Sequence, residues 1–325
     1  MAAVLGCALS AALLIWLLAQ LDWPVFWASL AQTRFDWIVA AVLLLLASIA
    51  VRSARWEVLS ALPAARLRDF FRAAAIGYLG NYVYPLRAGE LMRVIALKQL
   101  VPGSTLGRVL AAAALDRAFD LVGLGVFLAV VLHAHGVAAL GAQAVRAAAA
   151  LVALAALAIA VFVFTARHWG PLVAALSRRL PEKPARWLRH GYAQALEAAG
   201  AASPARLAAA FLLSLAASVI DYLAVWTLLA AFNWNLGALA AITVGLFVQI
   251  GGSLPSAPGY VGVIQVACVL ALSLFGVSQS EAVAFSVLYQ LTLLSVVLAC
   301  GLWAAASAGL SLSARRATAQ VEGGV

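Results

Sequence analysis

Three charged residues follow a proline in an otherwise apolar part of the sequence. Arg87, Glu90 and Arg93 come directly after Pro85, and their spacing of three residues places them on one face of a helix. Two cations and one anion make this group net positive, and a helix that begins here would add the positive end of its dipole. We therefore expect the group to bind a phosphate or a similar anion. The alternative is a self-neutralising ion cluster that holds a hairpin against its neighbour.

A second charged group lies near the middle of the apolar stretch 105–133. Asp116 and Asp120 are four residues apart and share a helix face, and Arg117 can reach Asp120 across three residues. These acids could pair with the arginines of the first group, couple to protons or cations, or hold Mg²⁺ between two carboxylates. Asp221 is a lone acid in a later apolar stretch, where it could partner an arginine or lie near the membrane surface.

Other kinds of site have no support in the sequence. The four histidines fall in or beside loops without the spacing of metal ligands, and no nucleophile and base stand out as a set. No glycine-rich loop has the spacing that cradles a phosphate. The three cysteines, Cys7, Cys268 and Cys300, are far apart and predict neither a disulfide framework nor a metal site. We expect no catalytic residue, no metal and no cofactor.

The composition places these charged groups in a membrane. Of 325 residues, 66% are hydrophobic and only 10% are charged, with a mean hydropathy of +1.04. A soluble domain carries about 25% charged residues. The net charge of +9 could suggest a nucleic-acid partner. However, no basic stripe is interleaved with aromatic residues as base stacking would need, so we expect no nucleic-acid binding.

Six stretches are apolar enough to cross a bilayer, which takes about 20 residues of helix. We predict full spans over residues 3–21, 37–52, 105–133, 145–166, 207–231 and 281–308. The second of these is short. We expect Trp37 at one of its ends, and Arg52 with Arg55 at the other, to anchor it at the two membrane interfaces.

Basic residues gather in three segments, which are residues 52–72, residues 167–206 and the tail with Arg315 and Arg316. Clusters of this kind mark the cytoplasmic side of a membrane protein. Six full spans place all three segments there only when both termini are inside. We therefore predict a multi-pass protein of the bacterial cytoplasmic (inner) membrane with cytoplasmic N- and C-termini and a cytoplasmic loop over 167–206.

Two further stretches, 73–101 and 237–276, are apolar on both sides of a break rich in glycine and proline. The breaks cover residues 80–90 and 251–262. Each limb would be roughly 21–27 Å long as a helix, and proline ends a helix by removing a donor and clashing with the preceding turn. We predict two re-entrant hairpins whose non-helical turns lie within the membrane, close to each other.

The two breaks share one internal spacing, Pro85-x-x-x-Gly89 in the first and Pro255-x-x-x-Gly259 in the second. Each hairpin is flanked by two full spans, and these run in opposite senses in the two halves of the chain. This order predicts an inverted repeat, and paired interrupted helices in such a repeat mark the midplane binding site of transporters. The chain would form a single transmembrane domain over residues 1–325. Its first repeat would cover residues 37–133 and its second repeat residues 207–308.

Four strings in the sequence resemble motifs of one known family, the lysylphosphatidylglycerol synthase transmembrane family of flippase-like proteins. The strings are Gly80-Asn81…Pro85-x-Arg87-x-Gly89-Glu90-x-x-Arg93, Asp116-Arg117-x-x-Asp120, Pro255-x-x-Pro258-Gly259-x-x-Gly262 and Arg52-x-x-Arg55-Trp56. The family's own form of the second string begins with Glu where this chain has Asp116. The resemblance covers about residues 10–310.

The resemblance implies that the chain moves a lipid across the bilayer, and a phospholipid, a hopanoid or a polyprenyl-linked glycolipid would each fit. Some members of the family are fused to a soluble aminoacyl-lipid synthase domain. We expect a stand-alone member without that domain or its reaction. The family often has an acid shortly after its second re-entrant motif, where this chain has Gln265. The resemblance therefore does not extend to a coupling acid at that place.

The leading hypothesis is a lipid flippase with an all-α polytopic fold of about six full transmembrane helices and two re-entrant hairpins in an inverted repeat. Arg87 and Arg93 would bind an anionic head group that Glu90 helps to orient. The predicted substrate-binding residues are Arg87, Glu90, Arg93, Asn81, Gly89, Pro85, Pro255, Pro258 and Gly259. The predicted coupling or ion-pair residues are Asp116, Arg117, Asp120 and Asp221.

Two other classes of function fit the same sequence. One is a membrane-embedded enzyme that modifies a lipid head group, with the paired aspartates holding Mg²⁺. The other is an ion channel or ion transporter built on the same inverted repeat. A test of lipid accessibility in reconstituted vesicles would separate transport from chemistry. The chain could also form a homo-oligomer.

Overall fold

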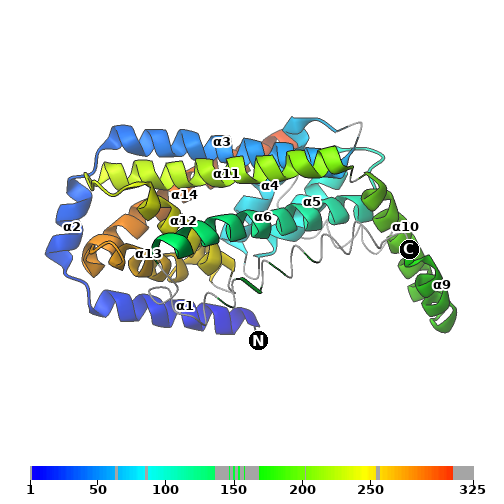
Figure 1. Ribbon diagram of the computed structural model, residues 1–325, viewed down its shortest axis with the longest axis horizontal. Helices are drawn as coiled ribbons and strands as arrows, with labels where there is room; N and C mark the ends of the chain where they lie inside the picture. The colour runs from blue at the N-terminus through cyan, green and yellow to red at the C-terminus, as the bar shows by residue number, and fades with distance from the viewer. Residues whose placement is uncertain are drawn as a thin grey trace.

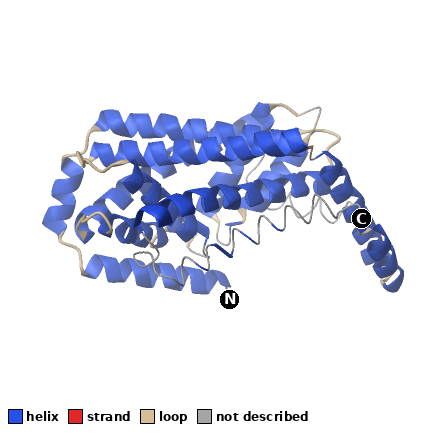
Figure 2. Ribbon diagram, in the orientation of Figure 1, coloured by secondary structure: helices blue, strands red, loops and turns tan. Residues whose placement is uncertain are grey.

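The protein is all-helical in the part of the chain that the structure, a computed structural model, describes (Figures 1 and 2). Every regular element there is a helix and none is a strand, which confirms the all-α prediction. The described residues are 2–62, 65–84, 87–135, 168–201, 203–253 and 257–309, with a few isolated positions between 136 and 167.

Three helices are long and apolar enough to cross a membrane. They are α3 (Phe35–Ser60), α11 (Pro204–Ala231) and α14 (Gln279–Ala308), and they contain the predicted spans 37–52, 207–231 and 281–308. Helices α3 and α11 make the most extensive contact between helices and lie side by side in Figure 1. These three helices form the frame of the bundle.

The predicted span 3–21 is part of a bent pair of helices. Helix α1 (Ala2–Ala19) is followed by α2 (Trp23–Ala31), and the two apolar helices meet at an angle of 97°. The Asp22 carboxylate accepts a hydrogen bond from the backbone N–H of Val25 over 3.2 Å, and this cap starts the new helix at the bend. Counted as one span, the pair raises the number of spans from three to four.

The prediction of six full spans is therefore not confirmed by the described residues. The predicted span 105–133 is helix α6 (Leu106–His135), which has the length of a span but carries Asp116, Arg117 and Asp120 in its middle. It is not among the helices that qualify on length and composition. The predicted span 145–166 lies almost wholly outside the described residues.

The first broken stretch is a pair of closely packed helices, α4 (Leu67–Val83) and α5 (Gly89–Leu100). Glycines let the two backbones approach. A Cβ atom on Gly80 would lie 2.8 Å from the Cα atom of Gly89, and one on Gly89 would overlap the carbonyl oxygen of Gly77. The hairpin shape expected for residues 73–101 is thus present, and its small residues face each other as in close-packed membrane helices.

The second broken stretch has the same form. Helix α12 (Ala238–Ser253) is followed by a short 3₁₀ turn, η3 (Pro258–Tyr260), and by α13 (Val263–Ser273), which packs back against α12. Inside the turn, Gly259 has a φ angle of +69°, and Gly262 before α13 has one of +84°. Glycine adopts this left-handed conformation without the steric cost that a Cβ atom adds.

Both breaks are shorter than the sequence suggested. The predicted non-helical segments 80–90 and 251–262 begin as helix, which continues to Val83 in one and to Ser253 in the other. The sequence prediction begins the first turn at Gly80-Asn81 and the second at Gly251-Gly252. In the structure, the close packing of the paired helices keeps these residues helical, and the chain departs from helix only beside the prolines. Pro85 and Pro255 themselves lie outside the described residues.

The predicted cytoplasmic loop over 167–206 contains two helices, α9 (Gly170–Arg179) and α10 (Glu182–Ala201). Helix α10 packs against α6, and α9 packs against α10. Figure 1 shows the pair projecting from the end of the bundle at which α11 begins. The charged side chains that the structure describes on these two helices are all exposed, namely Arg178, Arg179, Glu182, Lys183, Arg186 and Arg189.

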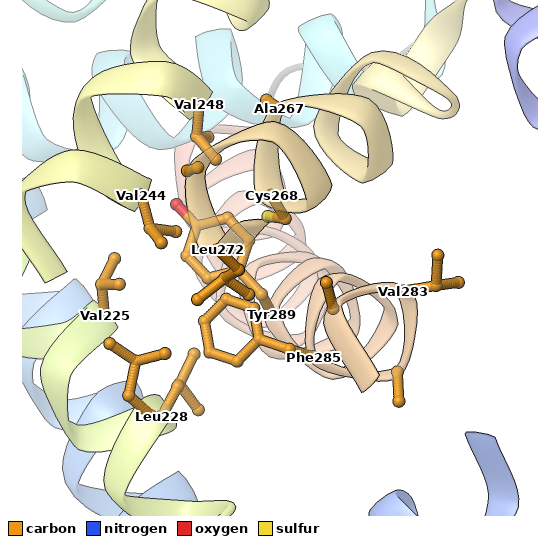
Figure 3. Close-up of a cluster of buried hydrophobic side chains, with 14 of the residues drawn as sticks. Val225, Leu228, Val244, Val248, Ala267, Cys268, Leu272, Val283, Phe285 and Tyr289 are labelled. Carbon is orange, nitrogen blue, oxygen red and sulfur yellow. The ribbon is translucent and has the colours of Figure 1, made fainter. Parts of the chain in front are cut away.

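The apolar core joins the second hairpin to the frame. Its largest cluster packs α11, α12, α13 and α14 around side chains such as Leu228, Val244, Cys268, Leu272 and Phe285 (Figure 3). A second cluster joins the first hairpin to α3 and α14. Each hairpin is therefore held by its own set of apolar contacts, with α14 shared by both.

We predict that the close approach of α4 and α5 is needed for stability. Gly89→Ala should lower the free energy of unfolding by about 1–3 kcal/mol because the new methyl group overlaps backbone that cannot move aside. Gly252→Ala is the matched control, since no atom lies within 4 Å of the position that its Cβ would take. Thermal unfolding in detergent measures both. Equal midpoints for the two variants would contradict the packing argument.

Candidate functional site

A cavity of about 590 Å³ lies between the two broken stretches. Its walls come from helices α3, α4, α5, α6, α11, α12, α13 and α14 and from the turns of the two breaks. The volume falls within the range of small-molecule binding sites, about 300–1,000 Å³. The cavity therefore lies where the two breaks come together.

The cavity has a charged part and an apolar part. Its charged lining residues are three arginines and three acids, namely Arg52, Arg87, Arg117, Glu90, Asp120 and Asp221. Four tyrosines contribute hydroxyl groups and ring faces, namely Tyr78, Tyr82, Tyr260 and Tyr289. Most of the remaining wall is aliphatic, with residues such as Leu45, Leu121, Leu124, Val225 and Leu293. A ligand that fits both parts is amphipathic.

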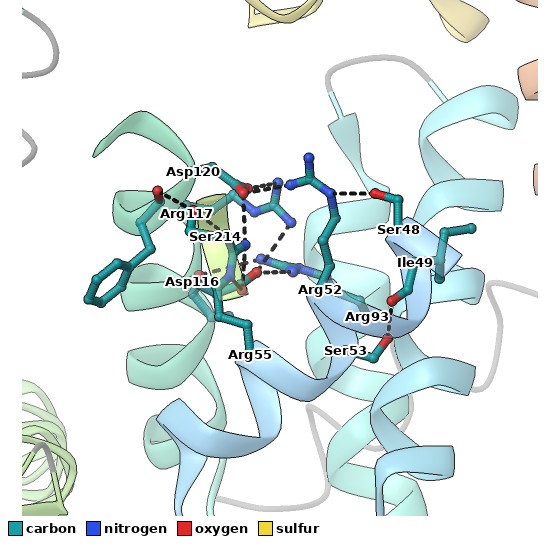
Figure 4. Close-up of polar contacts among 12 residues, drawn as sticks. Ser48, Ile49, Arg52, Ser53, Arg55, Arg93, Asp116, Arg117, Asp120 and Ser214 are labelled. Atoms are coloured by element: carbon teal, nitrogen blue, oxygen red, sulfur yellow. Dashed lines mark hydrogen bonds and ion pairs between the residues drawn. The ribbon is translucent and has the colours of Figure 1, made fainter. Parts of the chain in front are cut away.

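Beneath the cavity, Asp116 of α6 is the centre of a buried group of ion pairs (Figure 4). Its carboxylate accepts from Arg55 over 2.8 Å and from Arg93 over 2.9 Å. Arg117 approaches the same carboxylate at 3.4 Å. Arg55 also donates to the hydroxyl of Ser214 on α11 over 2.9 Å, so this group connects α3, α5, α6 and α11.

Asp120, one turn further along α6, faces the cavity and binds three arginines. Its distances are 2.6 Å to Arg52, 2.7 Å to Arg55 and 2.8 Å to Arg117. Arg52 donates at the same time to Asp221 of α11 over 2.5 Å. Of the two alternatives for the lone acid Asp221, the structure therefore shows pairing with an arginine, and Arg52 bridges α6 and α11.

Glu90 completes the network from the first hairpin. It pairs with Arg93 at 2.9 Å, as the spacing of three residues predicted, and with Arg117 at 3.4 Å. The guanidinium group of Arg93 also lies 4.8 Å from the centre of the Trp56 ring. The whole network contains four arginines and four acids, so its formal charges cancel. Cancellation of this kind is what makes charge tolerable at membrane depth.

Arg87 differs from the other arginines. Among the described residues it makes no ion pair, and its guanidinium carbon lies 5.9 Å from the centre of the Tyr260 ring. Its Nε atom is buried without a hydrogen-bond partner in the described part of the chain. The side chain lines the cavity. Arg87 therefore leaves one positive charge that the protein's described acids do not balance.

The two breaks touch each other at the cavity. The rings of Tyr82 and Tyr260 pack edge to face with their centres 6.0 Å apart. The second break is held by two amides: Gln290 donates to the carbonyl of Gly259 over 2.8 Å and accepts a hydrogen bond from Gln265. The predicted proximity of the two turns is confirmed. Gln265 acts here as a structural hydrogen-bonding residue.

The structure separates the predicted site residues into three sets. Arg87, Glu90, Arg117, Asp120 and Asp221 line the cavity together. The buried network beneath it holds Arg93 and Asp116, and the contact between α4 and α5 holds Asn81 and Gly89. Pro258 and Gly259 belong to the turn η3 without lining the cavity, while Pro85 and Pro255 lie outside the described residues.

The interpretation of Arg52 and Arg55 as interfacial anchors is wrong. Both lie within α3, which continues to Ser60, and Arg55 is fully buried. The helix can continue through two arginines because acids from α6 and α11 neutralise them. Their spacing of three residues, which puts both on one face, was the available signal. The lining tyrosines were also missed, since nothing in their spacing distinguishes them from core residues.

Of the three alternatives for the paired acids, ion pairing with the first group is found between Asp116 and Arg93 and, among the described residues, is not found for Arg87. Asp116 and Asp120 could have held Mg²⁺ as an i, i+4 pair. In the structure each carboxylate is instead surrounded by three arginines. This arrangement favours ion pairs over a metal site.

One comparison with known proteins bears on the site. The family model described as "Lysylphosphatidylglycerol synthase TM region" matches residues 3–301, which is nearly the whole chain. The match includes both broken stretches and every charged residue of the network. No curated protein matches the sequence.

We predict that the buried network carries much of the stability. Arg55→Ala leaves Asp116 with less charge compensation in a site where the two side chains are only 1% and 2% exposed, and it should cost about 3–5 kcal/mol of unfolding free energy. Arg34→Ala is the control, because the Arg34–Asp36 pair is equally short at 2.6 Å but more than half exposed. Its effect should be too small to detect in a denaturant titration. Similar losses for both variants would contradict a burial-based cause.

Proposed function

The chain belongs to the lysylphosphatidylglycerol synthase transmembrane family, and we propose that it moves an anionic lipid or lipid-linked molecule across the cytoplasmic membrane of a bacterium. The observation that carries the proposal is the cavity between the two broken helix pairs, in which Arg87 has no acidic partner among the described residues. A head group with a phosphate would supply the missing negative charge. The substrate would leave the protein unmodified.

The charge balance favours a head group with a single net negative charge. The network of four arginines and four acids is already neutral, so only Arg87 requires compensation. A phosphodiester carries one such charge and offers two oxygens to the planar guanidinium fork. A zwitterionic head group brings an additional cation that the site does not need.

The apolar wall of the cavity suits the rest of a lipid. Leu121, Leu124 and Val225 lie on the same cavity surface as Asp120 and Asp221, on the helices α6 and α11. An acyl or polyprenyl chain could lie along this wall while the head group contacts Arg87. This amphipathic lining supports a lipid substrate over a bare ion, which would need no apolar wall.

We propose that the two broken helix pairs are re-entrant and enter from opposite sides of the membrane. In this arrangement α3 to α6 form one repeat and α11 to α14 form the other, inverted one. Two features support it: each pair folds back on itself, and the breaks meet at Tyr82 and Tyr260. Within a bilayer, non-helical backbone is tolerated only where it is buried in protein or lines a cavity. Both turns adjoin a cavity here.

The same arrangement suggests the orientation. Helices α9 and α10 carry five basic residues against two acidic ones, which favours the cytoplasmic side for them and for both termini. We assign Arg87 to the head group, and Arg93 and Asp116 to the framework beneath it. Asp120 and Asp221, which pair with Arg52 at the cavity surface, are the residues that could change partners during transport.

An enzyme that modifies lipid head groups is the other candidate. Its strongest sequence support was the pair Asp116 and Asp120 as Mg²⁺ ligands. Because arginines already surround both carboxylates, a metal ion would have to displace several ion pairs. The geometry therefore supports transport without chemical change.

We predict that transport depends on the charge of Arg87. Arg87→Ala should reduce the rate at which a fluorescent phosphatidylglycerol crosses reconstituted vesicles by at least tenfold, since a charged hydrogen bond is worth about 1.5–3 kcal/mol. Arg87→Lys should restore part of the rate, because lysine keeps the charge but lacks the planar fork. Dithionite quenching of the outer leaflet measures the rate.

Arg34→Ala is the matched control for this experiment, because Arg34 is an exposed arginine that does not line the cavity. It should transport at the rate of the unchanged protein. Mass spectrometry of the same vesicles tests the alternative function. A lipid of altered mass, or an Arg87→Ala variant that folds and transports normally, would overturn the proposal.

We further predict a preference among head groups. Phosphatidylglycerol, with one net negative charge, should compete for transport several-fold better than zwitterionic phosphatidylcholine labelled on the same acyl chain. The preference should weaken in Arg87→Ala, because the uncompensated charge is then gone. A preference that survives this substitution unchanged would show that head groups are selected elsewhere.

A further inference from the structure

Helix α9 presents an exposed apolar stripe that no described part of the protein covers. Trp169, Leu172 and Leu176 follow one another at intervals of three and four residues and are 46%, 59% and 45% exposed. This spacing places them on one face of the helix. Leu180, just after the helix, adds a fourth apolar side chain that is 42% exposed.

A neighbouring face of α9 accounts for its packing. Val173 and Ser177 are buried, and α10 is the element against which α9 packs. Gly170 lies close to the ring of Tyr192 on α10, since a Cβ atom there would be 3.4 Å from the tyrosine oxygen. The helix is therefore held by one face while its apolar stripe faces outward.

The surroundings of the stripe are positively charged. Between residues 168 and 201 the sequence has five cationic and two acidic residues, namely Arg178, Arg179, Lys183, Arg186, Arg189, Glu182 and Glu197. The contact between Arg186 and Glu182 is long, at 3.9 Å, and highly exposed, so it neutralises little. A partner that covers the stripe therefore meets a positive rim.

The position of α9 identifies the partner. Helix α10 ends at Ala201, and the membrane-spanning helix α11 begins three residues later at Pro204. The pair α9–α10 is therefore connected directly to the end of a membrane-spanning helix. In Figure 1, α10 and α9 run steeply across the direction of α11 instead of continuing it, so they do not point straight away from the membrane.

From these observations we propose that α9 is an interfacial helix that binds an anionic lipid surface. Its tryptophan and leucines enter the boundary between head groups and acyl chains, and the basic residues contact anionic head groups. Exposed apolar residues with a basic rim beside a transmembrane helix are the features that such helices use. Each Lys or Arg near an anionic surface strengthens binding about fivefold. This surface is separate from the cavity, and the proposal does not depend on transport.

Fluorescence quenching in nanodiscs tests the proposal on the full chain. In a background with Cys7, Cys268 and Cys300 replaced by alanine, an NBD probe is attached at Leu176→Cys. Ala174→Cys is the matched control, because Ala174 is also exposed but lies on the opposite side of the same helix. Nanodiscs contain phosphatidylcholine alone or mixed with phosphatidylglycerol, and the quenchers are spin-labelled lipids and aqueous iodide.

We expect the probe at position 176 to be quenched several-fold more by spin-labelled lipid, and several-fold less by iodide, than the probe at 174. The difference should grow with phosphatidylglycerol and shrink in the Arg178→Glu, Arg179→Glu variant, which still keeps the apolar stripe. Equal iodide quenching at both positions would overturn the proposal. So would protection at 176 from both quenchers, because protein and not lipid would then cover the stripe.

Discussion

Arg55 and Asp116 are fully buried in the middle of the bundle, where an unpaired charge would be very costly. Their ion pair, extended to eight residues, connects α3, α5, α6 and α11 at one point. None of these helices can shift far without separating opposite charges in a medium that cannot solvate them. The remaining features of the molecule depend on this constraint, because it fixes where the first hairpin ends and where the cavity begins.

The cavity lies above the neutral network of ion pairs. Since four arginines and four acids satisfy one another, the break of the first hairpin can present Arg87 to the cavity as an additional cation. The second break approaches from the other half of the chain and is held by Gln265 and Gln290, whose amides carry no charge. The two halves therefore contribute differently: one supplies charge, and the other supplies a neutral hydrogen-bonded turn with Tyr260.

The outer surface of the bundle is apolar, in contrast to the charged network inside it. Large apolar side chains such as Leu43, Leu212, Leu291 and Leu302 are exposed on the long helices, which is stable only in contact with lipid. The exposed leucines of α9 extend this apolar surface beyond the spans, and two basic residues, Arg178 and Arg179, lie within three residues of Leu176. The transport proposed above would gain from such a surface, because the surface would hold anionic lipid near the bundle.

The sequence by itself determined the membrane class, the helical fold, the two Gly/Pro breaks and most charged residues that matter, since each follows from composition or local spacing. It also indicated the family through strings such as Asp116-Arg117-x-x-Asp120. It could not show which charges pair. The partners of Arg52 are 68 and 169 residues away, and local spacing carries no information about contacts at that separation. For the same reason, Arg87 and Arg93 looked equivalent in the sequence. Only the tertiary structure placed Arg93 beneath the cavity in a neutralised pair and placed Arg87 in the cavity wall without an acidic partner among the described residues. Burial and charge compensation depend on how helices distant in the chain pack together.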